Sequence, residues 1–141
     1  MANLDWPGVI KGPEQLLTGA QDLTGTWADL GDKLFVAGAR SLGLWLDLDI
    51  NNSQNARVRL LAIWEDDAAA DEYVLPIRTV GASDVKVEDE YIEFNVDADQ
   101  KMLLSWDLDG LVPRVQVQVM AGVLGAAPVG QIETAYVTTA V

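Results

Sequence analysis

An apolar side chain at every second position is the feature of this sequence that most restricts its fold. It is clearest in residues 42–50, LGLWLDLDI. Successive side chains of an extended strand point to opposite faces, so this segment has one face for a core and one for water, as half-buried antiparallel strands do. The inward face would carry Leu42, Leu44, Leu46, Leu48 and Ile50. The outward face would carry Gly43, Trp45, Asp47 and Asp49.

The same alternation recurs along most of the chain after Thr24. Strands are predicted at 56–64, 72–80, 91–97, 101–108, 114–122 and 132–139, and shorter ones at 25–31, 34–36 and 85–87. Their inward positions are Val58, Leu60, Ala62, Trp64, Ile92, Phe94, Val96, Met102, Leu104, Trp106, Leu108, Val115, Val117, Val119 and Ala121. Roughly eight strands separated by turns predict an all-β antiparallel β-sandwich, jelly-roll-like, with a simpler sandwich as the alternative. Little helix is expected, because the best candidate, 66–72, is one turn at most.

Turn-forming residues predict how the strands connect. Asn and Ser bond to their own backbone and Asn tolerates positive φ, so 51–55, NNSQN, predicts a hairpin between the strands on either side. Pro76 cannot donate a ladder hydrogen bond, which places 72–80 at a sheet edge or a bulge. Residues 1–23 have no sustained period, and we expect an N-terminal arm or irregular lead-in there, with Trp6 as an anchor. The β-sandwich domain is expected to occupy 24–141.

Composition excludes several functions. A chain of 141 residues is expected to form one domain, which buries roughly 70% of the surface that the unfolded chain exposes. The absence of cysteine and histidine removes disulfides, thiolate chemistry, the commonest general base and the commonest transition-metal ligand. A net charge of −13 argues against nucleic acid and anionic membranes as partners. Neither a membrane span nor a secretory leader is expected, so we predict that the protein is first present in a cytoplasm.

Residues 47–53, DLDINNS, resemble the start of a calcium-binding loop. An EF-hand loop needs oxygen ligands at positions 1, 3, 5 and 12 and glycine at position 6. The first three requirements are met by Asp47, Asp49 and Asn51, but positions 6 and 12 are Asn52 and Val58. A strand face explains the aspartates better, and DLDG at 107–110 is likewise predicted to close a strand and enter a turn. We assign no metal ligand, and a weak calcium site between neighbouring surface loops stays open as the alternative.

No catalytic arrangement stands out. The carboxylates at 65–66 and 88–93 lie in polar runs beside turns, whereas an acid that stays neutral near pH 7 needs a desolvated pocket. GVLGAAPVG at 122–130 lacks the Lys and the Ser or Thr of a phosphate-binding loop. We therefore expect neither enzymatic activity nor a cofactor, and a small hydrolase is the least favoured class.

Tryptophan positions suggest both core and surface roles. Trp64 and Trp106 lie on predicted core faces. Trp45 shares its face with aspartates and is a candidate partner contact, together with Trp6. An exposed aromatic side chain beside carboxylates can stack on a sugar ring or insert into a protein partner. The alternative is a Trp45 ring that lies across its own sheet.

Charge is unevenly distributed along the chain. Sixteen of the 22 acidic residues lie between Asp47 and Asp109, whereas residues 115–132 carry no charge at all. The outward positions of this segment and the residues that follow form a candidate oligomer interface, made of Gln116, Gln118, Met120, Val123 and Leu124. Charge depletion combined with small and apolar residues is typical of obligate interfaces. Cover by another part of the same chain is the alternative.

Several segments, taken in order, resemble a known class of protein. They are TGTWADLG (24–31), LGLWLDLDINNSQNARVRLLAIWED (42–66), DEYVLPI (71–77), VEDEYIEFNVDADQKMLLSWDLDGLVPRVQVQVMAG (87–122) and QIETAYVTTA (131–140). This series is similar to small all-β virion structural proteins in the head modules of tailed bacteriophages, the type that decorates or cements the capsid. The resemblance concerns a style of β-sandwich and carries no catalytic signature.

The resemblance implies a non-enzymatic protein that acts in many copies and binds a repetitive lattice, often as a trimer. The expected partners are further copies of the chain and capsid or other virion proteins, with neither nucleic acid nor membrane. The expected location is the virion, after assembly in the host cytoplasm. The rival class is a carbohydrate-binding β-sandwich module, with Trp45 and a loop calcium site as its signature.

Overall fold

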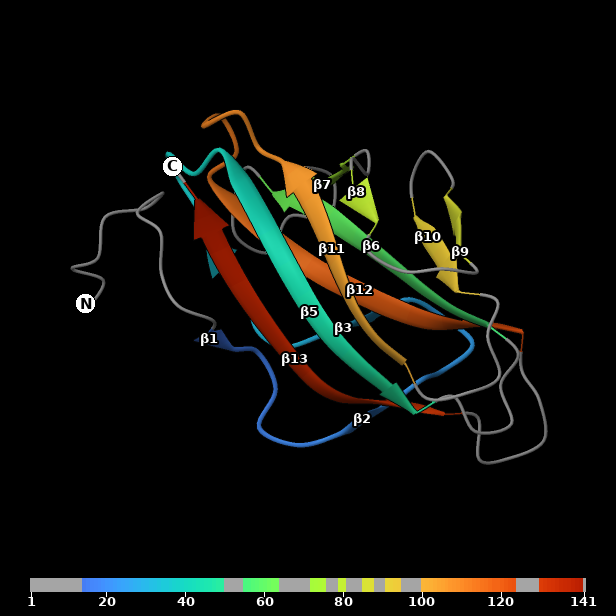
Figure 1. Cartoon of the computed structure of the whole chain (residues 1–141). Helices are drawn as coiled ribbons and strands as arrows, with labels where there is room; N and C mark the ends of the chain where they lie inside the picture. Colours follow the sequence, from blue (N-terminus) through green and yellow to red (C-terminus); the bar gives the residue numbers. More distant parts are fainter. Residues whose placement is uncertain are drawn as a thin grey trace.

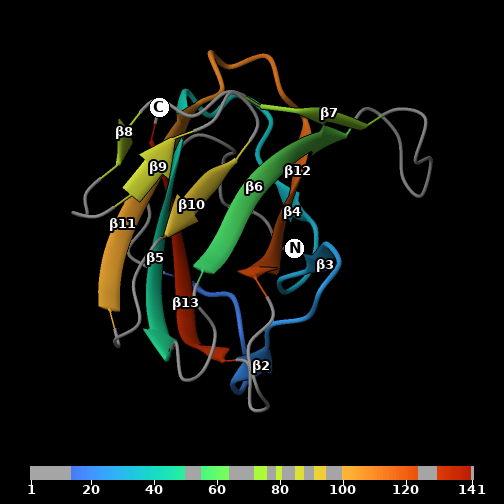
Figure 2. The same ribbon diagram turned by 90° about the vertical axis from the view of Figure 1, so that its right-hand side faces the viewer.

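Two antiparallel β-sheets packed face to face make up the structure (Figure 1, Figure 2). The computed structural model describes residues 14–49, 55–63, 72–75, 79–80, 85–87, 91–94, 100–123 and 130–140. The first sheet has the order β1-β13-β5-β11-β8, with β2 also paired to β13. The second has the order β3-β12-β6-β10-β9, with β4 also paired to β12 and β7 to β6. No helix occurs among the described residues, and the predicted all-β sandwich is confirmed.

Long central strands and short flanking strands form each sheet. The first sheet contains β1 (Glu14–Gln15), β2 (Gln21–Asp22), β5 (Ser41–Asp49), β8 (Thr79–Val80), β11 (Gln100–Asp107) and β13 (Gln131–Ala140). The second contains β3 (Ala28–Asp29), β4 (Leu34–Phe35), β6 (Asn55–Ile63), β7 (Glu72–Val74), β9 (Val85–Val87), β10 (Ile92–Phe94) and β12 (Arg114–Val123). The long strands coincide with the segments that alternate most regularly, because alternation lets a strand bury one face.

Strand pairing is nested along the chain. β9 pairs with β10, β8 with β11, β6 with β12 and β5 with β13, all antiparallel. This is the pairing of one long hairpin whose arms pass between the two sheets, which agrees with the predicted jelly-roll-like topology. The nested pairs adjoin one another where β5 lies beside β11 and β6 beside β10.

The core lies between the sheets and follows the alternation of the long strands. Every second residue of β5 is buried, beginning with Leu42 and Leu44, and so are the predicted inward residues of β12. Trp106 of β11 is fully buried, and its indole Nε1 has no hydrogen-bond partner among the described residues. Five predicted inward side chains lie outside the described part of the structure: Ile50, Trp64, Phe94, Val96 and Met102.

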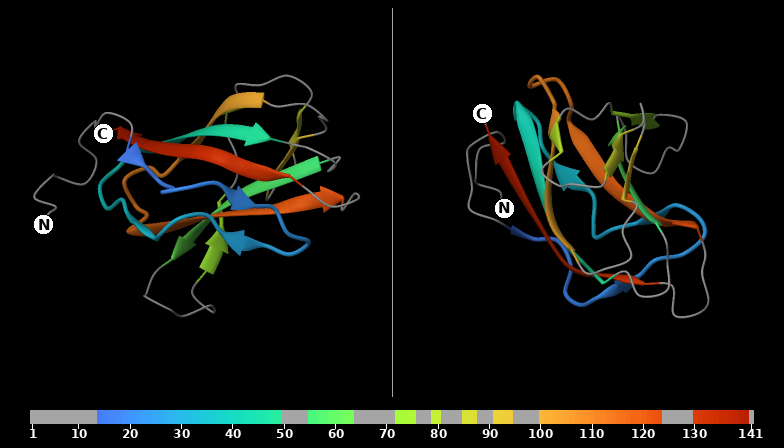
Figure 3. Two further views of the ribbon diagram at one scale, coloured as in Figure 1. Left: turned by 90° about the horizontal axis from the view of Figure 1, so that it is seen from below. Right: turned by 45° about the vertical axis from the view of Figure 1, so that its right-hand side comes forward.

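Residues 14–36 close one open side of the sandwich. β1 and β2 pair with β13 at the edge of the first sheet, and β3 and β4 pair with β12 in the second. Figure 3 shows this segment, in blue, running between β13 and β12. Its core side chains include Leu17, Leu23 and Leu30. Strands and core side chains thus already occur within residues 14–23, and the domain boundary predicted at Thr24 stays a prediction.

Two predicted connections are wrong. β5 and β6 lie in different sheets, so 51–55 does not join a hairpin. Likewise 72–80 is not one strand, because β7 pairs with β6 in the second sheet and β8 with β11 in the first. Alternation decides which face of a strand is buried, but it does not decide which strand lies beside it.

The turn after β11 agrees with the prediction made for DLDG. The strand ends at Asp107, and Asp109 and Gly110 follow with φ of 54° and 72°. Asp tolerates this left-handed conformation better than most residues because its short side chain bonds locally, and glycine adopts it freely.

Candidate functional site

The outer face of the second sheet carries two arginines that lie over aromatic rings. The guanidinium carbon of Arg59 is 4.3 Å from the centroid of the Trp27 ring, and that of Arg57 is 5.0 Å from the centroid of Tyr91. The two rings meet edge to face with their centroids 6.0 Å apart. We call these four residues, together with Gln118, the braced face. Such stacks are stabilising, because the face of an aromatic ring attracts a cation.

Hydrogen bonds extend the braced face across the sheet. Nε and Nη2 of Arg59 donate to Gln118 Oε1 at 2.8 and 2.6 Å, and Gln118 Nε2 donates to Asp29 Oδ1 at 2.9 Å. Nε of Arg57 donates to Glu93 Oε1 at 2.6 Å. Glu93 is buried, so losing this partner would leave a desolvated charge unpaired. The network connects β3, β12, β6 and β10.

Gln116, predicted to form part of an exposed interface, is buried instead. It is only 3% exposed. Its Nε2 donates to the carbonyl oxygens of Gly31 at 3.1 Å and Val117 at 3.0 Å. Gly31 has a φ of +69°, and a Cβ there would lie 2.6 Å from the Leu16 carbonyl oxygen, so this position requires glycine. From the sequence, two explanations were open for the uncharged segment that contains Gln116, an oligomer interface or cover by another part of the same chain. The second explanation applies to Gln116.

The other predicted interface residues fall into two groups. Gln118 and Met120 are partly exposed, and they lie directly opposite Arg59 and Arg57 across the β12–β6 ladder. The sheet therefore places Met120 beside the braced face, on the same side as Gln118. The side chain of Val123 and all of Leu124 lie outside the described residues. A role of Gln118 and Met120 in self-association stays a prediction.

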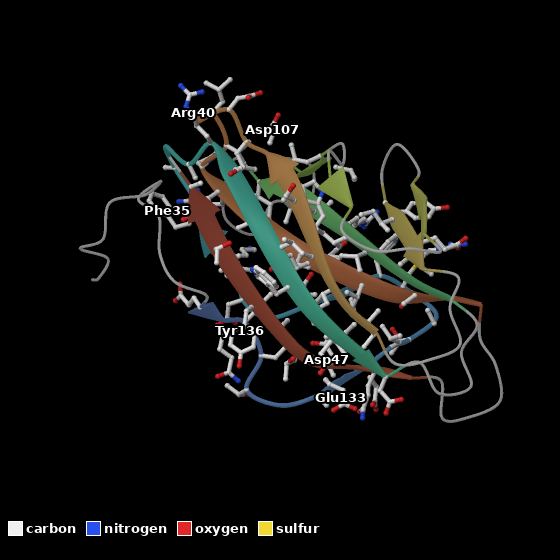
Figure 4. All side chains as sticks on the ribbon, in the orientation of Figure 1. Phe35, Arg40, Asp47, Asp107, Glu133 and Tyr136 are labelled. Atoms are coloured by element: carbon white, nitrogen blue, oxygen red, sulfur yellow. The ribbon has the colours of Figure 1, made fainter. Side chains whose placement is uncertain are left out.

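The outer face of the first sheet carries aromatic side chains without an arginine over them. Tyr136 of β13, Trp45 of β5 and Leu103 of β11 are direct neighbours across three strands. Trp45 is 46% and Tyr136 36% exposed, which confirms that Trp45 faces outward. No aromatic or cation–π contact among the described residues involves either ring. We call Tyr136, Trp45 and Leu103 the aromatic platform; Figure 4 shows Tyr136 on this face.

Small and polar side chains flank the aromatic platform. On one side of the platform is a row of cross-strand neighbours made of Thr138, Gly43 and Ser105. On the other side is the row that contains Thr134 and Asp47. A Cβ at Gly43 would lie 2.9 Å from the hydroxyl oxygen of Thr138, so the Thr138 side chain lies against this glycine beside Trp45. No side-chain hydrogen bond or ion pair within the described part of the chain engages the polar members of this set.

The aspartates of DLDINNS lie where the strand interpretation puts them. Asp47 and Asp49 occupy outward positions of β5, and Figure 4 shows Asp47 and Glu133 near the same end of the sheet. Among the described residues, no group of three or more His, Cys, Asp or Glu is placed to hold a metal ion. A calcium site between surface loops stays a prediction.

Two further apolar side chains are strongly exposed. Phe35 of β4 is 63% exposed and Leu111, in the turn before β12, is 79% exposed. Phe35 pairs with Arg114 at the start of β12, so it lies outside the aromatic platform (Figure 4). Trp6, the second predicted partner contact, lies outside the described residues.

No family model matches this sequence, and no curated protein matches it. Among solved structures, the chain is similar to the SPBc2 prophage-derived protein YomS, with a TM-score of 0.45 and 14% identity, over 94% of this chain and 98% of that chain. A likeness with this TM-score and this identity does not indicate a function. The functional argument therefore rests on the residues of this chain. Within the described ranges, no helix has the length and hydrophobicity that a membrane span requires.

Sequence reasoning missed Trp27 and Tyr91 and the stacks that they form. Arg57 and Arg59 alternate with inward residues, which was a signal that both face outward. Their aromatic partners lie 30 or more positions away in the chain, and no periodicity connects them. The register of β6 with its neighbours brings these residues together.

Proposed function

We propose that this chain is a non-enzymatic structural protein of a phage particle, which decorates or cements the capsid as a symmetric oligomer, with a trimer favoured. Its partners are further copies of itself and proteins of the capsid or virion. The sequence resemblance supports the class of protein, and the braced face supports the way in which copies associate.

The composition of the braced face is the observation that carries the proposal. Trp, Tyr, Arg and Met are enriched at protein interfaces, and Trp, Tyr and Arg account for most of the binding energy there. Arg57, Arg59 and Met120 lie on the adjacent strands β6 and β12, and the two arginines lie over the rings of Tyr91 and Trp27. A surface of this composition suits contact with another copy.

The braced face is also ordered before any partner binds. Arg57 is paired with Glu93, and Arg59 is linked through Gln118 to Asp29. Side chains that are already fixed lose less conformational entropy when an interface forms. Because both arginines have partners within the chain, an approaching copy would not leave them buried without a hydrogen-bond partner.

Residues 115–123 of β12, which lies beside β6 in this sheet, are uncharged, and this fits a symmetric assembly. Residues 115–132 carry no charge in a chain whose net charge is −13. A charge near a symmetry axis repeats in every copy, so like charges would face one another there. A symmetry axis that passes beside these uncharged residues avoids that repulsion.

Mass spectrometry of purified virions from the source tests the class of protein. The chain is expected as a component present in many copies, comparable to the capsid subunits. If it is missing from the particles, or present in trace amounts alone, a decorating or cementing role is excluded.

Light scattering on two matched variants tests the surface. Met120→Glu places a carboxylate beside the braced face, and we expect the oligomer to dissociate while circular dichroism still shows a β-type spectrum. Leu103→Glu makes a comparable change on the first sheet, and its mass should equal that of the unmodified protein. An intact oligomer in Met120→Glu would contradict association through this face.

A further inference from the structure

We propose that the aromatic platform binds a neutral polysaccharide, with sugar rings stacked on Trp45 and Tyr136. The site lies on the first sheet, opposite the braced face of the second sheet. It is a second activity of the molecule, beyond the structural role proposed above.

Stacking is the first element of the argument. The C–H faces of a pyranose ring are apolar and pack against the flat face of an aromatic ring. Trp45 and Tyr136 are cross-strand neighbours, 46% and 36% exposed, and both point outward from the sheet. No other ring or guanidinium covers them among the described residues. Two aromatic side chains are thus available on one open surface.

Hydrogen-bonding groups around the platform are the second element. Sugar hydroxyls both donate and accept hydrogen bonds, as do the hydroxyls of Thr134, Thr138 and Ser105, while an ionised Asp47 accepts them. These four side chains flank the platform in register and have no side-chain bonds within the described residues. Within the described part of the chain, no side-chain bond prevents them from orienting a sugar that stacks on the rings.

The size of the platform favours a glycan over a protein partner. Tyr136, Trp45 and Leu103 lie on three adjacent strands, so the row spans about 10 Å at the usual strand spacing. A stable protein interface needs about 800 Å² on each partner. One row of three side chains supplies a small part of that area, but it is large enough for one or two sugar rings.

The surface beside Trp45 and the charge of the protein restrict the class of ligand. Gly43 itself adds no side chain to the surface beside Trp45, which the side chains of Thr138 and Leu103 border. Asp47 and Asp49 face outward on the same strand, and the protein carries a net charge of −13, so an anionic polymer would be repelled. Neutral β-1,4-linked chains, whose C–H faces can stack on Trp45 and Tyr136 and which carry no charge, fit both features.

Titration of the full-length chain with defined oligosaccharides tests the proposal. Cellohexaose and chitohexaose serve as neutral probes and hyaluronan as the anionic comparison, followed by calorimetry and by tryptophan fluorescence. At least one neutral probe is expected to bind saturably, and hyaluronan is not.

Variants then locate the site. Trp45→Ala and Tyr136→Ala should each weaken binding by about tenfold, because each removes one stacking surface. Phe35→Ala removes an exposed aromatic ring outside the platform and should leave binding unchanged. All three variants should keep the oligomer mass of the unmodified protein, which separates this site from the braced face.

Three results would overturn the proposal. They are the absence of binding to both neutral probes at millimolar concentration, binding that survives Trp45→Ala, and a Trp45→Ala defect confined to attachment of the protein to capsids. The last result would assign the platform to a protein partner. The virion copy number and the oligomer mass of the unmodified protein depend on none of the three, so the proposed structural role is tested separately.

Discussion

The two outer faces of the sandwich contain similar side chains in different states. Both present one Trp and one Tyr on a sheet surface. On the second sheet, Arg59 lies over Trp27 and Arg57 over Tyr91, and hydrogen bonds connect the arginines to neighbouring strands. On the first sheet, Trp45 and Tyr136 have no such partner among the described residues.

The arginines of β6 account for the difference. Their long side chains reach over Trp27 and Tyr91, which directly precede β3 and β10, and their polar ends are satisfied within the chain. The outward positions of β5 are instead occupied by Gly43, Trp45 and two aspartates, none of which can cover a ring in this way. The same alternation pattern therefore yields a rigid, internally bonded face in one sheet and an open face in the other.

The largest change in unfolding free energy is expected for a substitution on the braced face. Arg59→Ala removes a cation–π contact and two hydrogen bonds to Gln118, which should lower the free energy of unfolding by about 2 kcal/mol. Urea denaturation measures the change. Arg40→Ala, an exposed arginine at the end of the sandwich (Figure 4), is the control and should change stability by less than about 0.5 kcal/mol. Equal effects would show that the bracing is not stabilising.

Glu93→Gln tests the comparison between the two outer faces more finely, because it removes one charge and changes the side-chain volume little. The side chains of Arg57 and Glu93 are 28% and 10% exposed, so their ion pair is partly screened by water. We expect a loss of about 1 kcal/mol in unfolding free energy, since the amide can still accept one weaker hydrogen bond. Asp47→Asn makes the same chemical change on the first sheet and should be neutral. A neutral Glu93→Gln would mean that the ion pair contributes nothing.

Trp45→Ala should have a smaller effect on stability than its size suggests. Cross-strand pairs contribute roughly 0.2–1 kcal/mol, and about half of this side chain is already in water, so a loss of about 0.5 kcal/mol is expected. Thermal or urea unfolding beside Trp27→Ala gives the direct contrast, because Trp27 packs against Arg59 and Tyr91. If Trp45→Ala is the more damaging of the two, the platform is structural.

Adding calcium should change the stability of the protein least of all. If Asp47 and Asp49 are outward strand residues and no more, then adding calcium or a chelator leaves the melting temperature unchanged. Specific binding would instead stabilise the fold by about 2.7 kcal/mol at a hundredfold excess over Kd. A calcium-dependent shift that disappears in the double variant Asp47→Asn, Asp49→Asn would restore the loop calcium site.

The strands and their buried faces were predictable from sequence, but the neighbours of each strand were not. Alternation in β5 and β12 identified which side chains are inward, because burial of one face imposes a period of two. The hairpin predicted at 51–55 failed since turn-forming residues also suit a connection that crosses between sheets. Pro76 was likewise compatible with either an edge strand or a break between strands. The strands on either side of it, β7 and β8, lie in different sheets.

The candidate surfaces were predictable to the extent that they depend on local pattern. Trp45, Gln118 and Met120 were recognised as outward residues because alternation within one strand suffices for that. Gln116 was not recognised as buried, because its hydrogen-bond partner, the Gly31 carbonyl, is 85 positions away in the chain. The stacks of the braced face depend in the same way on contacts between strands that are distant in sequence.

The mass of the unmodified protein at micromolar concentration tests most directly whether this chain acts as an assembly component. Size-exclusion chromatography with light scattering should give a multiple of the 15.3 kDa chain mass, and three times that value for the favoured trimer. A mass of 15.3 kDa, that of a single chain, would contradict self-association through the braced face.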